Sequence, residues 1–172
     1  MRIRLLYLLF VSTAMPCISQ TIDGALKRFN SGSVPYISVP ELKSVSPILL
    51  DTRKKEEYQV SHIEGAIWTG FKTFTLDSLQ RQVPDKEAPI VVYCSIGVRS
   101  EQIGEKLRKA GYSNVKNLYG GIFEWKNQGN PVVDSMGRPT EEVHAFDKHW
   151  GKLLTNAKKV YHTKPERIEN QP

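Results

Sequence analysis

A cysteine and an arginine, separated by four residues, have the clearest chemical potential in this chain. Cys94 follows an apolar run at residues 90–93 and opens a loop, residues 94–100, after which a helical pattern begins at once. Cationic groups and helix N-termini lower the pKa of a cysteine, and the thiolate is its nucleophilic form. We therefore predict that Cys94 is a reactive nucleophile with Arg99 beside it.

The loop residues suit the binding of an anion around that sulfur. A turning backbone with several N–H groups forms an anion-binding nest, and the helix dipole adds to its positive potential. Gly97 permits a backbone conformation closed to other residues, Arg99 can donate two parallel hydrogen bonds, and Ser100 is placed to cap the helix. We expect the loop to face solvent and to bind substrate through Ser95, Ile96, Gly97, Val98, Arg99 and Ser100.

The alternative for Cys94 is a small buried hydrophobic residue at a strand end. For a cysteine alone this is the better interpretation, but the glycine, arginine and serine that follow favour the reactive one. Metal binding is not indicated, because the histidines are scattered and form no cluster with the cysteines. We predict neither a metal nor a cofactor. The histidines are His62, His144, His149 and His162.

Residues 1–19 have the pattern of a secretory signal. Arg2 and Arg4 precede the apolar residues 5–11, which are too few to span a bilayer, since spanning takes about 20 residues. We expect cleavage after Ser19, an exported protein that is periplasmic or secreted, and no membrane attachment after cleavage. An uncleaved anchor is the alternative. Cleavage would leave Cys94 as the single thiol, which excludes an internal disulfide.

The chain is moderately basic, with 24 Lys and Arg against 18 Asp and Glu and a formal net charge of +6. Many of the basic residues lie in the tail, residues 148–167. Acidic residues are interspersed there, and no series of aromatic residues suits the stacking of bases. We interpret this charge as a solvated surface and predict no nucleic-acid partner.

Short apolar runs alternate with helical patterns from residue 36 onward. The runs predict strands, and a helix should begin at the capping sequence that starts at Ser38. Such alternation predicts an α/β fold with a parallel sheet covered by helices on both faces. Sites in these sheets lie beyond the carboxyl ends of the strands, where Cys94 is placed. The predicted strands are residues 48–50, 66–68, 90–93 and 115–118.

We divide the chain that follows the signal into three parts. Residues 20–35 form a lead-in segment with a short amphipathic piece, residues 36–133 form the domain, and residues 134–172 form a helical extension with a frayed end. We expect a helix in the extension because its apolar residues recur at helical spacing. These residues are Val143, Phe146, Trp150, Leu153 and Leu154.

Four motifs, in this order, resemble those of the rhodanese family of single-domain sulfurtransferases. The resemblance covers residues 36–133 and includes Ser61 where the family usually has glycine. Any one of these motifs is weak evidence, but four in the right order are strong evidence. The motifs are residues 49–53 with Glu57 and Tyr58, residues 62–66, residues 93–100, and residues 118–125.

The resemblance implies a three-layer fold with a central parallel sheet of about five strands. It also implies that Cys94 carries sulfur as a persulfide, taken from a small anionic donor such as thiosulfate and passed to cyanide, a thiol or a thiol-bearing protein. Arg99 would help bind the donor. We expect Asp51, Arg53 and His62 to tie strand ends together, although Arg53 could also reach the mouth of the site as a substrate-binding residue.

Two other functions compete with sulfur transfer. Cysteine phosphatases and arsenate reductases also place a thiolate in an anion nest with an arginine, but these families have a longer loop than the four residues here. A persulfide- or redox-sensing or partner-binding module without significant turnover is the second alternative, since a solitary low-pKa thiol is open to oxidation.

Overall fold

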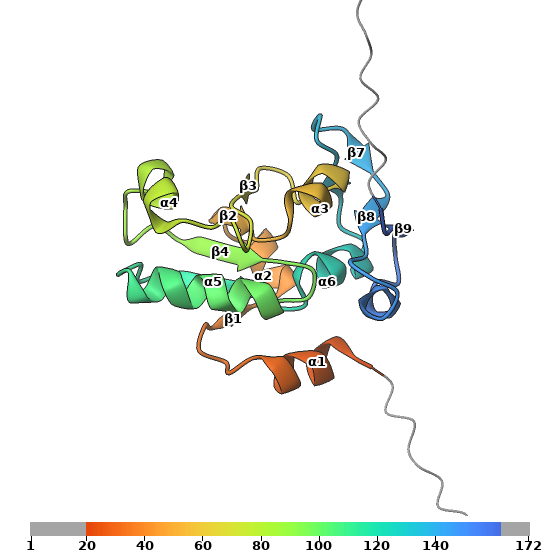
Figure 1. Cartoon of the computed structure of the whole chain (residues 1–172), viewed down its shortest axis with the longest axis horizontal. Coiled ribbons are helices and arrows are strands. Elements are labelled where there is room, and N and C mark those ends of the chain that lie inside the picture. The colour runs from red at the N-terminus through yellow and green to blue at the C-terminus, as the bar shows by residue number, and fades with distance from the viewer. Residues whose placement is uncertain (1–19, 163–172) are drawn as a thin grey trace, which may run out of the picture.

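A five-stranded parallel sheet forms the centre of the protein, as the sequence predicts (Figure 1). The computed structural model describes residues 20–162, so the predicted signal and the end of the tail lie outside the described residues. The strand order is β1-β5-β4-β2-β3, with β4 in the middle. The strands are β1 (Tyr36–Ile37), β2 (Ile48–Asp51), β3 (Ile67–Trp68), β4 (Ile90–Tyr93) and β5 (Val115–Leu118). The edge strand β1 is too short for the sequence pattern to show.

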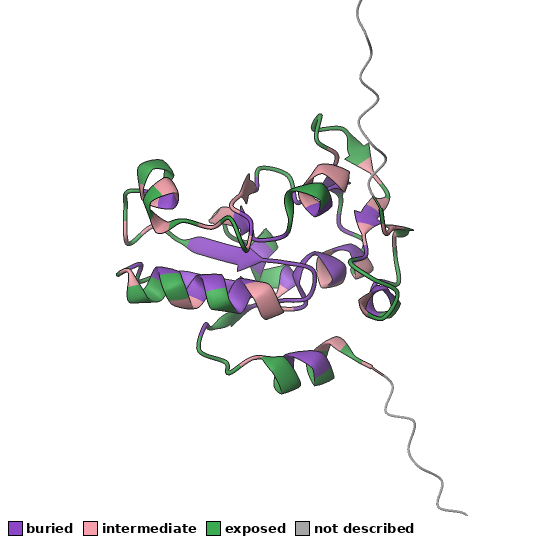
Figure 2. Cartoon of the chain, viewed as in Figure 1, coloured by how far each residue is buried: buried purple, intermediate pink, exposed green. Residues whose placement is uncertain are grey.

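Helices cover both faces of this sheet because its central strand is apolar on both sides. In β4, Ile90 and Val92 point into one core, whereas Val91 and Tyr93 point into the other. All four residues are buried, so β4 is purple along its length in Figure 2. The helices are α1 (Ile22–Phe29), α2 (Val39–Lys43), α3 (Lys55–Val60), α4 (Leu76–Gln82), α5 (Val98–Lys109) and α6 (Gly121–Asn127).

The two cores divide the helices between the faces. Helices α4 and α5 contribute Leu79, Ile103 and Leu107 to the first core. Helices α2 and α6 contribute Leu42 and Phe123 to the second, which α1 and residues beyond α6 also join. The helices on the two faces therefore hold β4 rigidly, and the carboxyl end of β4 gives Cys94 a fixed position.

Local capping explains where two of the helices start. The Ser38 hydroxyl accepts a hydrogen bond from the Glu41 N–H, and the Glu41 carboxylate accepts one from the Ser38 N–H, so the predicted capping box at α2 is confirmed. Thr21 caps α1 by accepting from the Gly24 N–H at 3.0 Å. The amphipathic piece predicted in the lead-in segment is therefore a true helix, with Ala25 and Leu26 buried against the domain.

The prediction of a helix in the extension is wrong. Residues 132–162, which lead into and form the extension, contain short strands and one 3-10 turn, η1 (Trp150–Leu153). Phe146 has a positive φ of 65°, which an α-helix does not tolerate. The strands are β6 (Val132–Val133), β7 (Pro139–Thr140), β8 (Glu142–His144) and β9 (Lys158–Val160), paired β6 with β7 and β8 with β9.

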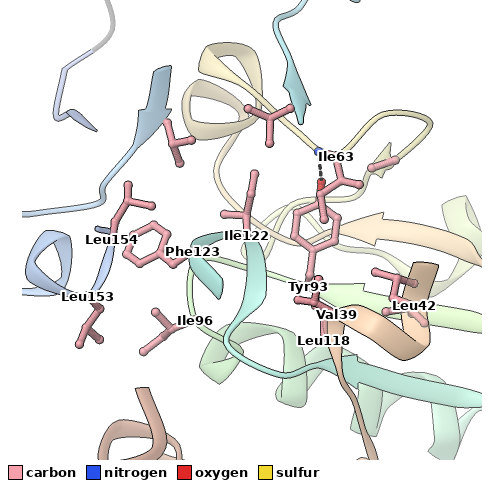
Figure 3. Packing of buried hydrophobic residues seen from close by; sticks show 14 of the residues in the cluster. Val39, Leu42, Ile63, Tyr93, Ile96, Leu118, Ile122, Phe123, Leu153 and Leu154 are labelled. Carbon is pink, nitrogen blue, oxygen red and sulfur yellow. Dashed lines mark hydrogen bonds between the residues drawn. The ribbon is translucent and has the colours of Figure 1, made fainter. Parts of the chain in front are cut away.

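The apolar spacing that suggested a helix has another physical origin. Val143 and Ala145, two residues apart in an extended segment, are both buried in the second core. Leu153 in η1 and Leu154 directly after it join the same core. Figure 3 shows Leu153 and Leu154 beside Phe123 and Ile96. The described part of the extension is thus packed on the domain, although its secondary structure differs from the predicted helix.

Within residues 20–162, no helix is long and apolar enough to cross a membrane.

Candidate active site around Cys94

Cys94 lies at the carboxyl end of β4, at the edge of the sheet where parallel α/β folds place their sites. Its side chain is only 1% exposed, although it lines a pocket of about 150 Å³. The expectation of a solvent-facing loop is wrong for residues 94–97, which are all buried. They are buried because α1, β5 and α6 pack around them, and the sulfur is therefore held in a mostly dry environment.

Gly97 shapes the loop and binds the sulfur. It is the N-cap of α5 in the left-handed conformation, with φ of 107°, which favours glycine. A Cβ atom here would lie 3.2 Å from Leu26 Cδ2 and 3.4 Å from the Leu118 carbonyl oxygen. The Gly97 N–H donates to Cys94 Sγ at 3.2 Å. The glycine is therefore needed for the left-handed turn and for the close packing of the loop on Leu26 and Leu118.

Asn117 on β5 fixes the loop from below, a role that the sequence does not reveal. Its Nδ2 donates to the Gly97 carbonyl oxygen at 2.8 Å, and its Oδ1 accepts from the Ser100 hydroxyl at 2.8 Å. Ser100 is therefore not the helix cap that we predicted, because Gly97 takes that position. Ser100 lies in the first turn of α5, fully buried, with its hydroxyl beside both Asn117 and the sulfur.

The start of α6 holds the other side of the loop. The Ile122 N–H donates to the Cys94 carbonyl oxygen at 2.9 Å, and the Phe123 N–H donates to that of Ser95 at 3.1 Å. Gly121 makes this approach possible, since a Cβ atom there would lie 2.3 Å from the Cys94 carbonyl oxygen. The turn at Gly120 and Gly121 therefore positions the loop as well as turning the chain.

The environment of Cys94 favours its thiolate. Burial on its own raises the pKa of the thiol, but the positive charge of Arg99 and hydrogen bonds from Ser100 and the Gly97 N–H outweigh this, and the pKa is lowered. The Ser100 hydroxyl has one proton and two acceptors nearby, and a charged sulfur competes for it better than a neutral amide oxygen. The thiolate is therefore stabilised by groups fixed in the fold.

Arg99 forms a bidentate ion pair that the sequence analysis missed. Its two terminal nitrogens donate to the Glu57 carboxylate at 2.7 and 2.8 Å, and Nη2 also donates to Ser95 Oγ at 2.9 Å. The Glu57 side chain is 1% exposed and that of Arg99 is 18% exposed. Burial opposes ionisation of Glu57, but the hydrogen bonds and charge of Arg99 lower its pKa to about 2. The family resemblance includes Glu57, but the residue types alone do not show that Glu57, and not its exposed neighbour Glu56, pairs with Arg99.

Arg53 does not line the pocket. It is fully buried and pairs with Asp51 at 2.6 Å, and it also donates to the Ser61 carbonyl oxygen at 2.6 Å. The His62 ring stacks on the Tyr58 ring, and the His62 backbone forms an isolated antiparallel β-bridge with Val133. These residues tie strand ends to the α3 loop, which is the structural role that we expected for them.

The pocket above the sulfur is bordered by three aromatic residues that sequence reasoning did not assign to the site. Phe29 comes from α1, whereas Phe146 and Trp150 come from the extension. Of the predicted loop residues, Gly97 and Ser100 lie beneath the sulfur instead of on the pocket wall. The loop residues on that wall are Cys94, Ser95, Ile96, Val98 and Arg99.

Phe146 is held in a strained conformation at this pocket. A bulky residue with φ of 65° is an outlier, and such strain costs about 1–3 kcal/mol. Its N–H donates to His144 Nδ1 at 3.1 Å, and the Arg99 guanidinium lies 5.0 Å from the centre of its ring. These contacts fix the ring over the arginine at the edge of the pocket.

Within residues 20–162, no group of three or more histidine, cysteine or acidic side chains is arranged to hold a metal ion.

The lowered pKa of the Cys94 thiol leads to a prediction about its alkylation. Because Cys94 is stabilised as a thiolate, its alkylation by iodoacetamide should have a pH midpoint below that of an ordinary cysteine, about 8.5. The Ser100→Ala variant removes one stabilising hydrogen bond, so its midpoint should rise. The measurement is the alkylation rate of the Cys94 peptide against pH, read by mass spectrometry. The same peptide in the urea-unfolded chain is the control, and a midpoint at or above that control contradicts the prediction.

Comparison with known proteins agrees with this geometry. A family model for the rhodanese-like domain matches residues 39–128. The chain is 35% identical over 135 residues to the tRNA uridine(34) hydroxylase of Erwinia tasmaniensis, covering 70% of this chain and 36% of that one. It is 38% identical over 101 residues to the adenylyltransferase and sulfurtransferase UBA4 of Meyerozyma guilliermondii, covering 54% of this chain and 24% of that one.

A solved structure shares the fold. The rhodanese-like domain of an Anabaena protein superposes with a TM-score of 0.53 and 24% identity, covering 80% of this chain and 96% of that one. By contrast, the chain spans only about a third of the length of the first curated relative and about a quarter of the second. The matched residues 39–128 include Cys94 and Arg99 but exclude Phe29, Phe146 and Trp150.

Proposed function

Since the chain belongs to the rhodanese-like domain family, we propose that it is a sulfurtransferase that carries a sulfane sulfur on Cys94 as a persulfide. The observation that supports this most is the environment of the sulfur. Cys94 Sγ lies at a pocket, receives hydrogen bonds from the loop and has a lowered pKa. A thiolate held in this way is prepared to attack a sulfur atom.

The proposed reaction has two steps. In the first, the Cys94 thiolate attacks the sulfane sulfur of an anionic donor, and the donor's S–S bond breaks with its electron pair on the leaving group, which is sulfite when the donor is thiosulfate. In the second, cyanide or a thiolate attacks the outer sulfur of the persulfide. The S–S bond to Cys94 then breaks, which yields thiocyanate or a new persulfide and restores the thiolate.

The surrounding residues have defined roles in this proposal. The Gly97 N–H and the charge of Arg99 stabilise negative charge on the sulfur before attack and after release. Because Glu57 occupies the Arg99 fork, Arg99 acts on the sulfur through its charge. Asn117 is a positioning residue, since it holds the loop through the Gly97 carbonyl oxygen.

The names of the relatives support this function unequally. One relative is named in part as a sulfurtransferase, which agrees with a thiolate at the site. Another is named as a tRNA hydroxylase, and this chain covers only 36% of that relative and 24% of the first. The proposal therefore follows the described site, in which the thiol is the reactive group.

Intact-protein mass spectrometry tests this function. Incubation of the sulfur-free protein with thiosulfate or a thiosulfonate should add one sulfur atom to Cys94, and cyanide should remove it. Phosphatase chemistry predicts instead the turnover of a phosphate ester, and redox sensing predicts added oxygen with peroxide and no transfer to cyanide. Absence of the added sulfur with every donor would refute sulfur transfer.

We further propose that the protein acts outside the cytoplasm. The support is the order of basic, apolar and small residues within residues 1–19. When the full chain is expressed in a bacterial host, the exported form should begin at Gln20, as N-terminal sequencing would show. A matched variant, Leu8→Arg, interrupts the apolar region and should keep the chain in the cytosol. Full-length protein in the cytosol for both chains would contradict export.

A further inference from the structure

We propose that the pocket above Cys94 selects an organic sulfur donor by its apolar group, in preference to a small inorganic oxyanion such as thiosulfate. This proposal rests on the proposed sulfur transfer at Cys94 and names the substrate class of that site. The carrier of the sulfur would be a thiosulfonate or persulfide with an aryl or similarly sized alkyl group.

The first observation is an aromatic rim around the pocket, formed by Phe29, Phe146 and Trp150. The Phe29 and Trp150 rings meet edge to face with their centres 5.8 Å apart. Phe29 is 52% exposed and Phe146 is 38% exposed, so both rings have surface that the core does not cover. The rim therefore offers apolar surface directly beside the reactive sulfur.

The second observation is where the rim comes from. Its three residues lie outside residues 39–128, the part of the chain that matches the family model. Two separate segments reach the same pocket, α1 from one side and the residues around η1 from the other. The rim is therefore an addition to the rhodanese-like core, which suits a role in specificity.

The third observation is the charge of the pocket. Arg99 is the only cationic side chain among the residues that line it within the described chain, and its fork is occupied by Glu57. Its guanidinium lies against the Phe146 ring on the other side. Glu57 and Ser95 take three of the five N–H groups of Arg99, so an oxyanion that binds there meets the negative charge of Glu57 and finds only the remaining N–H groups, whereas an apolar group needs no such contact.

Other charged side chains lie nearby but outside the pocket. Lys54, Lys55 and Lys72 line a neighbouring hollow that Arg99 and Phe146 also border. They can attract an anion towards this side of the molecule. They do not line the space above Cys94, where the donor has to place its sulfur.

The size of the pocket agrees with an aryl group. Its volume is about 150 Å³, and an apolar cavity of about that volume takes up a benzene molecule. Ile96 and Val98 complete the apolar wall between the rim and the sulfur. A phenyl ring on the donor can therefore rest between the rim and this wall with its reactive sulfur towards Cys94.

The chemistry can be written for benzenethiosulfonate. The Cys94 thiolate attacks the terminal sulfur of the donor, which becomes the outer sulfur of the persulfide. The bond between that sulfur and the sulfonyl sulfur breaks, and its electron pair leaves with benzenesulfinate. One negative charge stays on the persulfide and one on the sulfinate, so atoms and charge balance.

The experiment compares thiosulfate, methanethiosulfonate and benzenethiosulfonate as donors to the full chain. The readout is kcat/KM for persulfide formation on Cys94, divided by the rate constant of the same donor with a free thiol. After this correction we expect benzenethiosulfonate to exceed methanethiosulfonate by about tenfold or more, because small apolar groups are discriminated by factors of this size. Thiosulfate should be the poorest of the three donors.

Variants of the rim test its part in this preference. Phe146→Ala and Phe29→Ala should each lower the corrected benzene-to-methane ratio several-fold, because each removes apolar surface that borders the pocket. Both side chains are substantially exposed, so the fold should survive, and circular dichroism would show it. Phe74→Ala is the matched control, because Phe74 does not line this pocket.

The outcomes separate this proposal from the one on which it rests. Equal corrected values for all three donors, or a ratio that the rim variants leave unchanged, would overturn the selection of an organic donor while sulfur transfer stands. Failure of every donor to add sulfur to Cys94 would overturn sulfur transfer itself. A lower ratio in Phe146→Ala and Phe29→Ala, but not in Phe74→Ala, supports the proposal.

Discussion

The Cys94→Ser variant should lose all transfer of sulfur to cyanide and all gain of sulfur mass at residue 94. A hydroxyl at this position has a far higher pKa than a thiol, so the groups that lower the pKa of Cys94 cannot make it a nucleophile at neutral pH. An alkoxide would also form no persulfide. The expected result is activity at the level of the reaction without protein, measured as thiocyanate formed from cyanide and a sulfur donor.

The control for this variant is the other cysteine of the chain. Cys17→Ser should transfer sulfur as the unchanged protein does, because Cys17 lies in the predicted signal. Cys94→Ser should keep its fold, since serine is nearly isosteric and the Gly97 N–H can donate to its oxygen. If transfer persisted in Cys94→Ser but stopped in Cys17→Ser, Cys94 would not be the residue that carries the sulfur, and our proposal would be wrong.

The sheet and its helices could be predicted from the sequence because their signals are local. The run in β4 is apolar throughout, β2 is apolar up to Asp51, and β5 begins and ends with the apolar Val115 and Leu118. The Ser38 capping box marks the start of α2 without reference to the rest of the chain. The site at the end of β4 follows from the same reasoning, since topology alone places the carboxyl ends of parallel strands at one edge.

The surroundings of Cys94 could not be predicted because they depend on distant parts of the chain. Glu57 and Asn117 reach the loop from α3 and β5, and their spacing to Cys94 obeys no period. The extension shows the same limit in another form. Its apolar residues follow a helical spacing, yet Asp147 accepts hydrogen bonds from the backbone N–H groups of His149 and Trp150, which favours the short turn η1.

The ion pair between Arg99 and Glu57 leads to the second large effect, which concerns stability. On the sequence alone, loss of Arg99 should weaken donor use with little change in melting temperature, because the loop was expected to face solvent. The structure reverses the second half of this expectation. Arg99→Ala leaves the buried Glu57 carboxylate without its partner, and breaking such a pair costs about 3 kcal/mol or more.

In melting temperature, this loss corresponds to roughly 10 °C for a domain of this size. Donor kcat/KM should also fall about tenfold or more, because a charge that stabilises the thiolate is removed. Arg138→Ala is the matched control, since Arg138 pairs with Asp134 on the surface, with its own side chain 67% exposed. An exposed pair of this kind contributes at most about 1 kcal/mol, so this variant should melt close to the unchanged protein.

The pH dependence of unfolding tests whether loss of the ion pair with Glu57 causes the expected loss of stability in Arg99→Ala. The pKa of Glu57 is lowered to about 2 in the folded protein, so its contribution to stability is fully present above its unfolded pKa and is lost as the pH falls towards 2. The difference in the free energy of unfolding between the unchanged protein and Arg99→Ala should therefore be largest near neutral pH and shrink below about pH 4.5. Urea unfolding of both proteins from pH 7 to pH 3 measures it. If the difference stayed constant over this range, Arg99 would stabilise the fold through packing on Phe146 and the loop, and the charge of Glu57 would play no part.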